Sequence, residues 1–362
     1  MSRKLIIWIG SALGLALILL SFKDKPELTG ASPKKRDGQL QLDTVPLGTL
    51  ATVTDGVAAG NERGEIRHFS FDGGDPVLTS YTVCSNAISA PILEVAGCYY
   101  VGDENGLFRA FQPGVGEKWS YRTGNQITGG ACFNRGLIWV GSHDHTLYAF
   151  DAASGVCRHE IECGGQINAT PVLDVEGRHL FLGNCDGILR RIDLASGKVD
   201  GELDFASPIP AQPLLADGTL YLQTHGGELV AIDTATFTVR WRATVRSGSV
   251  AAPFVTATYA VANVTGKELP LFDRKSGAPA GLLEAEEAMA PIRCGDDTAL
   301  YGVSQRGKLY RWTRKGNAWH RTRLVDFQTD CRDGVLRFGN RLLVPDESGG
   351  LFYYLEDSPH AP

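Results

Sequence analysis

The sequence repeats itself about every forty residues. Eight segments in which a tight turn leads into an alternating apolar strand start at residues 64, 106, 145, 187, 227, 267, 307 and 350, so successive starts lie 42, 39, 42, 40, 40, 40 and 43 residues apart. A second marker, an Ala-Pro pair or a relative of it, keeps the same rhythm at Pro91, Pro171, Pro213, Pro253 and Pro291. Two markers in phase over eight units indicate one repeated structural unit.

Each unit reads as four strands separated by turns. In the third unit "GLIWVGS" alternates between apolar and polar residues, "HDH" turns, "TLYAFDA" alternates back, "ASG" turns again and "VCRHEIEC" forms a fourth strand. A period of two residues is that of a β-strand, and the 43 glycines and 17 prolines favour many short strands with tight turns. The sequence therefore predicts an all-β, eight-bladed β-propeller of four-stranded antiparallel blades over residues 39–358.

The two ends of the repeat predict how the ring closes. The last unit stops after its third strand, "GGLFYYLE", while the first is preceded by the strand-like "QLQLDTV" at residues 39–45. We expect this N-terminal strand to complete the last blade as its outer strand, which would leave no open edge.

The N-terminus has a different composition. Residues 5–22 are an uncharged apolar run flanked by basic residues, and eighteen residues of helix would span roughly 27 Å. We expect residues 1–22 to form a transmembrane signal-anchor helix, residues 23–38 a flexible linker and residues 359–362 a tail. This predicts a single-pass membrane protein with an extracytoplasmic propeller. The alternative is a cleaved signal and a secreted or periplasmic protein.

Charge excludes one class of partner. The formal net charge is −6 and no basic stripe is visible, so we expect no nucleic-acid partner. A protein or peptide is the expected ligand.

The turns between second and third strands provide the candidate binding rim. One of them, "HDH" at residues 143–145, raises the question of a metal site, which His225 would join as a third ligand. The interpretation as a structural turn is favoured, because such turns prefer Asn, Asp and Gly. The residues expected to project from this rim are Glu62, Arg63, Asp103, Glu104, His143, His145, His225, Gln305 and Arg306.

The strand and turn motifs carry a family resemblance. "AFDAASG", "RIDLASG" and "LFDRKSG" are similar to the A-x-D-x-x-T-G-x-x-x-W repeat of the pyrroloquinoline-quinone-type propellers. In that family the Trp packs between blades, and Trp119, Trp241 and Trp319 match it here. His159 and Gly201 depart from the motif, so the inter-blade belt is expected to be incomplete.

A closer likeness is to the C-terminal propeller of the β-alanine-activating enzyme, of the acyl-CoA synthetase family. It rests on "GSHDHTLYAFD" and "ECGGQINATP" and implies a shared propeller, since the adenylation and carrier domains have no counterpart here. The outer-membrane-assembly lipoprotein propeller resembles the chain as a more distant relative of the same fold.

Catalytic and cofactor signatures are not found in the sequence. The quinone-dependent relatives use a vicinal Cys-Cys disulfide, a calcium site and a catalytic Asp, whereas none of the eight cysteines here is adjacent to another. We therefore predict no catalytic, metal or cofactor-binding residues and a non-enzymatic scaffold. The alternatives are an oxidoreductase dependent on pyrroloquinoline quinone or calcium with a degenerate site, and an accessory role in amino-acid or acyl activation. Disulfides among the cysteines are left open.

Overall fold

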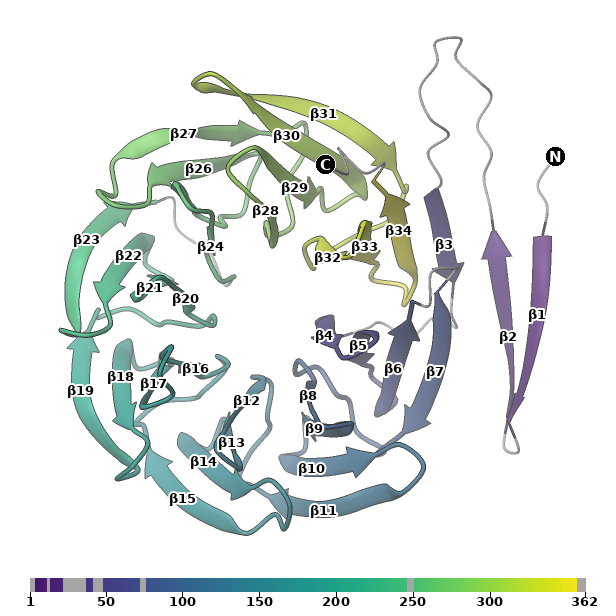
Figure 1. Cartoon of the computed structure of the whole chain (residues 1–362), viewed down its shortest axis with the longest axis horizontal. Helices are drawn as coiled ribbons and strands as arrows, with labels where there is room; N and C mark the ends of the chain where they lie inside the picture. Colours follow the sequence, from purple (N-terminus) through teal and green to yellow (C-terminus); the bar gives the residue numbers. More distant parts are fainter. Residues whose placement is uncertain are drawn as a thin grey trace.

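The chain forms a ring of β-sheets around a central opening, as the computed structural model shows (Figure 1). The structure describes residues 48–71, 76–245 and 251–356 in full, and residues 4–11, 14–21 and 37–41 as backbone strands. In each blade the first strand lies nearest the opening and the fourth lies outermost (Figure 1). These residues form eight blades of four antiparallel strands, the last extended outwards by two further strands from the N-terminal stretch, which confirms the predicted eight-bladed propeller.

The first four blades follow the chain in order. Blade 1 contains β4 (Ala51–Val53), β5 (Gly56–Gly60), β6 (Glu65–Ser70) and β7 (Val77–Thr82). Blade 2 contains β8 (Leu93–Val95), β9 (Cys98–Gly102), β10 (Leu107–Gln112) and β11 (Gly116–Arg122). Blade 3 contains β12 (Ala131–Asn134), β13 (Leu137–Gly141), β14 (Thr146–Asp151) and β15 (Cys157–Glu162). Blade 4 contains β16 (Val172–Leu173), β17 (His179–Leu182), β18 (Ile188–Asp193) and β19 (Lys198–Asp204).

The remaining blades continue this arrangement. Blade 5 contains β20 (Leu214–Ala216), β21 (Thr219–Gln223), β22 (Glu228–Asp233) and β23 (Thr238–Thr244). Blade 6 contains β24 (Phe254–Val255), β25 (Tyr259–Val261), β26 (Glu268–Asp273) and β27 (Pro279–Glu284). Blade 7 contains β28 (Cys294–Gly295), β29 (Ala299–Val303), β30 (Lys308–Lys315) and β31 (Ala318–Asp326). Blade 8 contains β32 (Leu336–Phe338), β33 (Arg341–Pro345), β34 (Leu351–Leu355) and, from the other end of the chain, β3 (Asp37–Gln41).

Burial follows the position of a strand in its blade. The middle strands are buried on both faces, as in β14, whereas the outer strand β15 alternates between half-buried and exposed residues. The reason is that neighbouring blades cover both sides of the middle strands. For example, Phe108 of blade 2 stacks on Phe150 of blade 3, with ring centroids 5.6 Å apart. Each fully buried side chain of this size contributes roughly 1.5–3 kcal/mol.

Ring closure by the N-terminal strand is confirmed. β3 pairs antiparallel with β34, with Leu40 opposite Leu351 and Gln39 opposite Phe352. The strand begins at Asp37, two residues before the expected start, and residues 42–45 of the predicted segment lie outside the described residues. The last blade therefore joins both ends of the propeller.

The predicted apolar helix at residues 5–22 is not supported. That stretch contains β1 (Lys4–Ser11) and β2 (Gly14–Ser21), which pair with each other and, through β2, with β3. A continuous apolar run has no periodicity that separates a helix from strands, and Ile6, Ile7 and Ile9 are β-branched. Among the described residues no helix has the length and apolar character needed to cross a membrane.

Glycines at the ends of second strands let the next inter-blade loop approach closely. A Cβ on Gly141 would lie 2.0 Å from Cγ2 of Ile167, and one on Gly102 would lie 2.2 Å from Cγ2 of Ile127. Both isoleucines are fully buried. The same contact recurs between Gly60 and Ile88 and between Gly183 and Ile209. The period of the sequence thus places a glycine where two blades meet.

Substituting Gly141 by Ala should destabilise the fold by about 1–3 kcal/mol, because the new methyl group overlaps Ile167. Urea unfolding of Gly141→Ala, Ile167→Ala and the double variant would measure this. We expect the double variant to be less destabilised than the two single losses combined, since Ile167→Ala removes the clashing atom. Strictly additive losses would contradict a steric cause.

Candidate functional site

The turns between second and third strands, here called rim turns, share one capping device. In most of these turns the first residue is buried and its side chain accepts hydrogen bonds from backbone amides later in the turn; in blade 6, Oδ1 of Asn263 instead accepts from the amide of Ile292. Oδ1 of Asp103 accepts from the amides of Asn105 and Leu107, both at 2.9 Å. The same device occurs at Asn61, Ser304 and Asp346. The first turn position is therefore structural.

The second turn residue is anchored through its backbone. Its amide donates to a carbonyl of the preceding inter-blade loop, as Glu104 does to Ala87 at 3.0 Å and His225 to Pro208 at 2.8 Å. His143, Cys185, Gln305 and Glu347 make the equivalent bond. The backbone bond is common to these turns, whereas the side chains at this position differ in chemistry from blade to blade, and that of His143 adds contacts of its own.

Seven of the nine predicted rim residues are exposed. They are Glu62, Arg63, Glu104, His145, His225, Gln305 and Arg306, and they come from five different blades. Asp103 and His143 do not project, because both are buried beneath the rim. That these residues bind a partner stays a prediction.

Asp103 is buried because it organises its own blade. Its Oδ2 accepts from Nη1 of Arg109 at 2.8 Å, and Nε of Arg109 contacts Glu117 at 3.2 Å. Burial on its own would raise the pKa of Asp103, but the Arg109 hydrogen bond and the Leu107 and Asn105 amides outweigh it, so its pKa lies below the usual value. Sequence reasoning missed this because Arg109 six residues later gives no local signal.

The "HDH" turn is a structural turn in the folded chain. Nδ1 of His143 lies 2.8 Å from the Gln126 amide nitrogen, which donates to it, and Nε2 lies 2.7 Å from the Thr128 hydroxyl. Burial lowers the pKa of His143, which favours this neutral imidazole. His145 adopts a φ of 75°, as the turn requires. Both ring nitrogens of His143 are thus occupied within the protein.

The structure brings no metal-binding group together in the part of the chain that it describes. No cluster of three or more His, Cys, Asp or Glu residues there is placed to hold a metal ion. All eight cysteines belong to this part, and all are free thiols. Burial raises the pKa of Cys163 to about 11 and that of Cys132 to about 12, so both are protonated at neutral pH.

The predicted inter-blade tryptophans do not all act alike. Nε1 of Trp119 donates to the carbonyl of Ala152 in blade 3, and Nε1 of Trp241 donates to that of Arg274 in blade 6, both at 3.0 Å. Trp319 instead lies edge-on against Tyr259 of blade 6, with ring centroids 5.8 Å apart.

The positions where the Trp motif fails are filled by other side chains. His159 stacks on Trp139 at 5.5 Å and lies over Gly197, where a Cβ would be 2.3 Å from the ring. Phe237 of blade 5 fills the space beside Gly201. The belt expected to be incomplete is thus continued by substitutes at both places.

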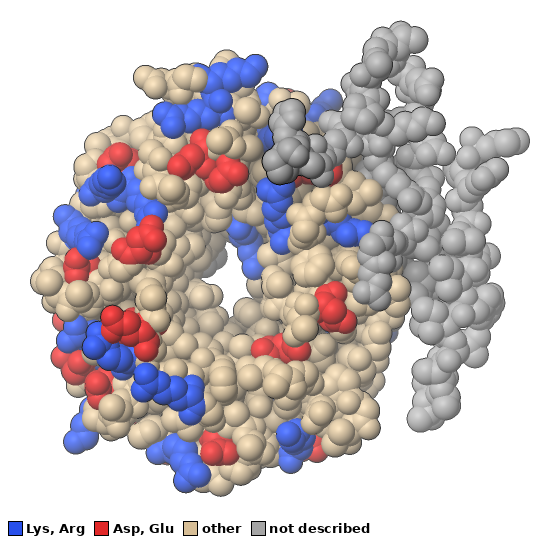
Figure 2. All heavy atoms as spheres, in the orientation of Figure 1, with Lys and Arg blue, Asp and Glu red and all other residues tan. Residues whose placement is uncertain are grey.

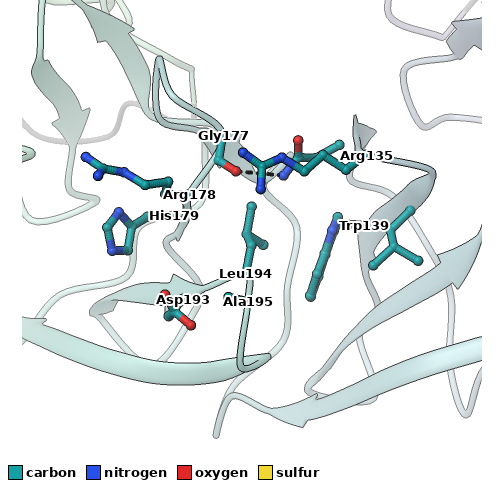
Figure 3. Close-up of a pocket in the computed structure, with 10 residues that line it drawn as sticks. Arg135, Trp139, Gly177, Arg178, His179, Asp193, Leu194 and Ala195 are labelled. Carbon is teal, nitrogen blue, oxygen red and sulfur yellow. Dashed lines mark hydrogen bonds between the residues drawn. The ribbon is translucent and has the colours of Figure 1, made fainter.

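Two hollows lie at seams between blades. One, about 540 Å³, opens on the rim between blades 8 and 1 and is lined by Glu62, Ser89, Arg332 and Glu347 among others. The other, about 490 Å³, lies between blades 3 and 4 on the face opposite the rim, with Arg135, Trp139, His179 and Leu194 in its lining (Figure 3). No local sequence signal marks the second hollow, because its lining comes from three separate turns and four strands.

Charged side chains of both signs are interspersed around the ring (Figure 2). No single sign of charge dominates this face of the described residues, so shape and local pairing would set its specificity.

Comparison with known proteins gives one family. A family model described as outer membrane protein assembly factor BamB matches residues 104–321, more than half of the chain. The outer membrane protein assembly factor BamB of Nitrosomonas eutropha is 26% identical over 165 residues, which cover 44% of this chain and 39% of that protein. The chain thus matches about two fifths of the length of that relative.

Solved structures agree on the fold. The crystal structure of BamB from Moraxella catarrhalis superposes with a TM-score of 0.72 at 16% identity, covering 87% of this chain and 96% of that one. The computationally designed Ika8 protein gives 0.73 at 13% identity, with coverages of 86% and 97%. At such identities the likeness shows the fold alone. The comparisons support the quinone-type propeller resemblance and do not support the closer likeness to the β-alanine-activating enzyme.

Asp103→Asn should destabilise the protein at pH 7 by about 3 kcal/mol, because Arg109 loses its buried ionic partner. A carboxylate with a lowered pKa contributes stability above its unfolded pKa of about 3.9 and loses it as the pH falls through the folded value. The deficit should therefore shrink below pH 4. Chemical denaturation at several pH values would measure it, with Glu104→Gln as the exposed control; an unchanged deficit at low pH would contradict the ionic origin.

Proposed function

Because the chain belongs to the family described as outer membrane protein assembly factor BamB, we propose that it is a non-enzymatic scaffold that binds a protein partner on its rim during outer-membrane protein assembly. The role in assembly comes from the name of the matched relative and is proposed for this chain. The part played by the rim comes from the geometry.

One observation carries the role of the rim. In several rim turns the second residue is fixed by its backbone amide while its side chain is exposed. Glu104, His225 and Gln305 illustrate this with an acid, an imidazole and an amide on the same backbone position. A partner would meet a preorganised backbone, so only the side chains would be ordered on binding, which favours specific binding.

The hollow between blades 8 and 1 gives this rim a place for a protruding side chain. Arg332 pairs with Glu347 across 2.7 Å, and Arg293 pairs with Asp333. Glu62 also lines the hollow and is exposed. A basic side chain of the partner fits beside Glu62, since the other acids named here already have partners.

The proposed location is at the outer membrane, by analogy with the relative's name. A single-pass anchor at residues 5–22 has no support in the described strands β1 and β2. The division into residues 1–22, 23–38, 39–358 and 359–362 is part of this proposal.

No contact in the described part of the chain supports either alternative function. A quinone- or calcium-dependent oxidoreductase and an accessory to amino-acid or acyl activation both stay as proposals. A quinone absorbance band or stoichiometric calcium in the purified full chain would support the first.

The rim proposal predicts a loss of function without a loss of stability. Replacing Glu62, Glu104, His225 and Gln305 together by Ala should weaken partner binding about tenfold or more. Because all four side chains are exposed, each change should alter the free energy of unfolding by no more than about 0.5 kcal/mol.

The measurement is rescue of outer-membrane protein levels in host cells from which the gene has been deleted, alongside thermal unfolding of each variant. The matched control replaces four exposed lysines beside third-to-fourth-strand turns on the opposite face, Lys118, Lys198, Lys275 and Lys315, by Ala. Full rescue by the rim variant, or equal failure of both variants, would count against the rim.

A further inference from the structure

The side chain of Arg274 closes the seam between blades 5 and 6. Arg274 follows Asp273 in the third-to-fourth-strand turn of blade 6 and pairs with Asp217 of blade 5 at 2.8 Å. Its Nε donates to the Tyr221 hydroxyl at 3.0 Å, and its Nη1 donates to the carbonyl of Thr256 at 3.2 Å. A guanidinium therefore occupies this seam and is fully engaged there.

The seam between blades 3 and 4 has the same backbone but different side chains. Leu194 stands at the position of Arg274, Trp139 at that of Tyr221, and Arg135 at that of Asp217. Arg135 and Asp217 have nearly the same φ, 49° and 47°, so the turns correspond. Leu194 is too short and too apolar to repeat the contacts of Arg274, and the seam is left as the hollow of about 490 Å³.

This hollow contains an unused hydrogen-bond donor. Trp139 is 1% exposed and lines the hollow, and its indole N–H has no partner among the described residues. Nε1 of Trp119, Trp241 and Trp312 each donates to a backbone carbonyl at 3.0 Å. This N–H is open to the hollow and is not sealed from solvent, so a carbonyl of a ligand can accept from it in place of solvent.

The mouth of the hollow combines a free cation with apolar surface. Arg135 reaches over the hollow from the β12–β13 turn, opposite His179 and Asp193 (Figure 3). Arg178 pairs with Glu176 and His179 with Asp174, whereas Arg135 has no acidic partner in the described part of the chain. Phe133 and Val175, 38% and 82% exposed, lie within two residues of Asn134 and Gly177, which line the hollow.

We propose that this seam is a second docking site, which takes an apolar side chain of an extended, acidic protein segment. The apolar side chain packs against Leu137 and Leu194, a backbone carbonyl of the segment accepts from the Trp139 indole, and an adjacent carboxylate pairs with Arg135. The exposed Phe133 and Val175 favour a protein segment over a small molecule, because they offer contact area beyond the hollow. This site lies on the face opposite the rim and does not depend on the rim proposal.

The test is a titration of the full chain with three peptides. Binding is monitored through the chemical shift of the Trp139 indole N–H in NMR spectra. The probe is Ac-Gly-Ser-Leu-Glu-Glu-Ser-Gly-amide, with one twin in which Leu is Ser and another in which both Glu are Lys. We expect a saturable shift with the first peptide and at least about tenfold weaker binding of both twins.

Variants of the site make the test specific. Arg135→Asp should reverse the charge preference toward the Lys peptide. Arg135→Asp combined with Leu194→Arg recreates the Asp217–Arg274 arrangement, and it should close the hollow and abolish binding of all three peptides without lowering Tm. Val175→Asp should weaken binding of the acidic peptide. The same change at Val115, a matched exposed valine in blade 2, should leave binding unchanged.

Three results would overturn the proposal. They are no response of Trp139 to the acidic peptide at millimolar concentration, equal binding of its Lys twin, and undiminished binding to the Arg135→Asp, Leu194→Arg variant. The rim variant with four alanines should bind the peptide like the unaltered protein, which separates a failure here from a failure of the rim proposal.

Discussion

The rest of the structure depends on the backbone hydrogen bonds that link each rim turn to the inter-blade loops beside it. In blade 2 the Glu104 amide donates to Ala87 of the loop before it, and the Asp103 carbonyl accepts from Ile127 of the loop after it. Blades 3 and 4 repeat both bonds. The glycines that end the second strands allow this approach, because any side chain there would overlap the loop isoleucine.

Since backbone atoms hold the rim together, the side chains of the rim turns divide into two groups with different roles. Buried first-position residues such as Asp103 and Asn61 cap the turns, and the exposed residues that follow are free to differ. On the opposite face, side chains decide whether a seam is closed. Arg274 fills the seam between blades 5 and 6, whereas no equivalent side chain fills the seam beside Leu194. The rim is therefore uniform in backbone and varied in chemistry, whereas the seams vary in whether they are filled at all.

The propeller, its blade count and the closing strand could be predicted from the sequence, because a forty-residue period and alternating strands are local signals that recur eight times. The helix at residues 5–22 was predicted wrongly, because an unbroken apolar run looks the same in a helix and in a strand pair. The rim was predicted as a set of turns, but Asp103 and His143 were assigned to the surface. Their partners, Arg109 in one case and Gln126 and Thr128 in the other, come from another strand or loop.

The sequence by itself determined the repeat, the fold class and the turn chemistry, since each follows from the spacing of residues within one unit. Only the tertiary structure decided which side chains are exposed, which thiols and carboxylates are buried, and which seam is left open. Those properties depend on contacts between blades, where residues about forty positions apart, such as Asn134 and Gly177, meet across a seam. A pattern read along one unit holds no information on how its neighbour fills the space between them.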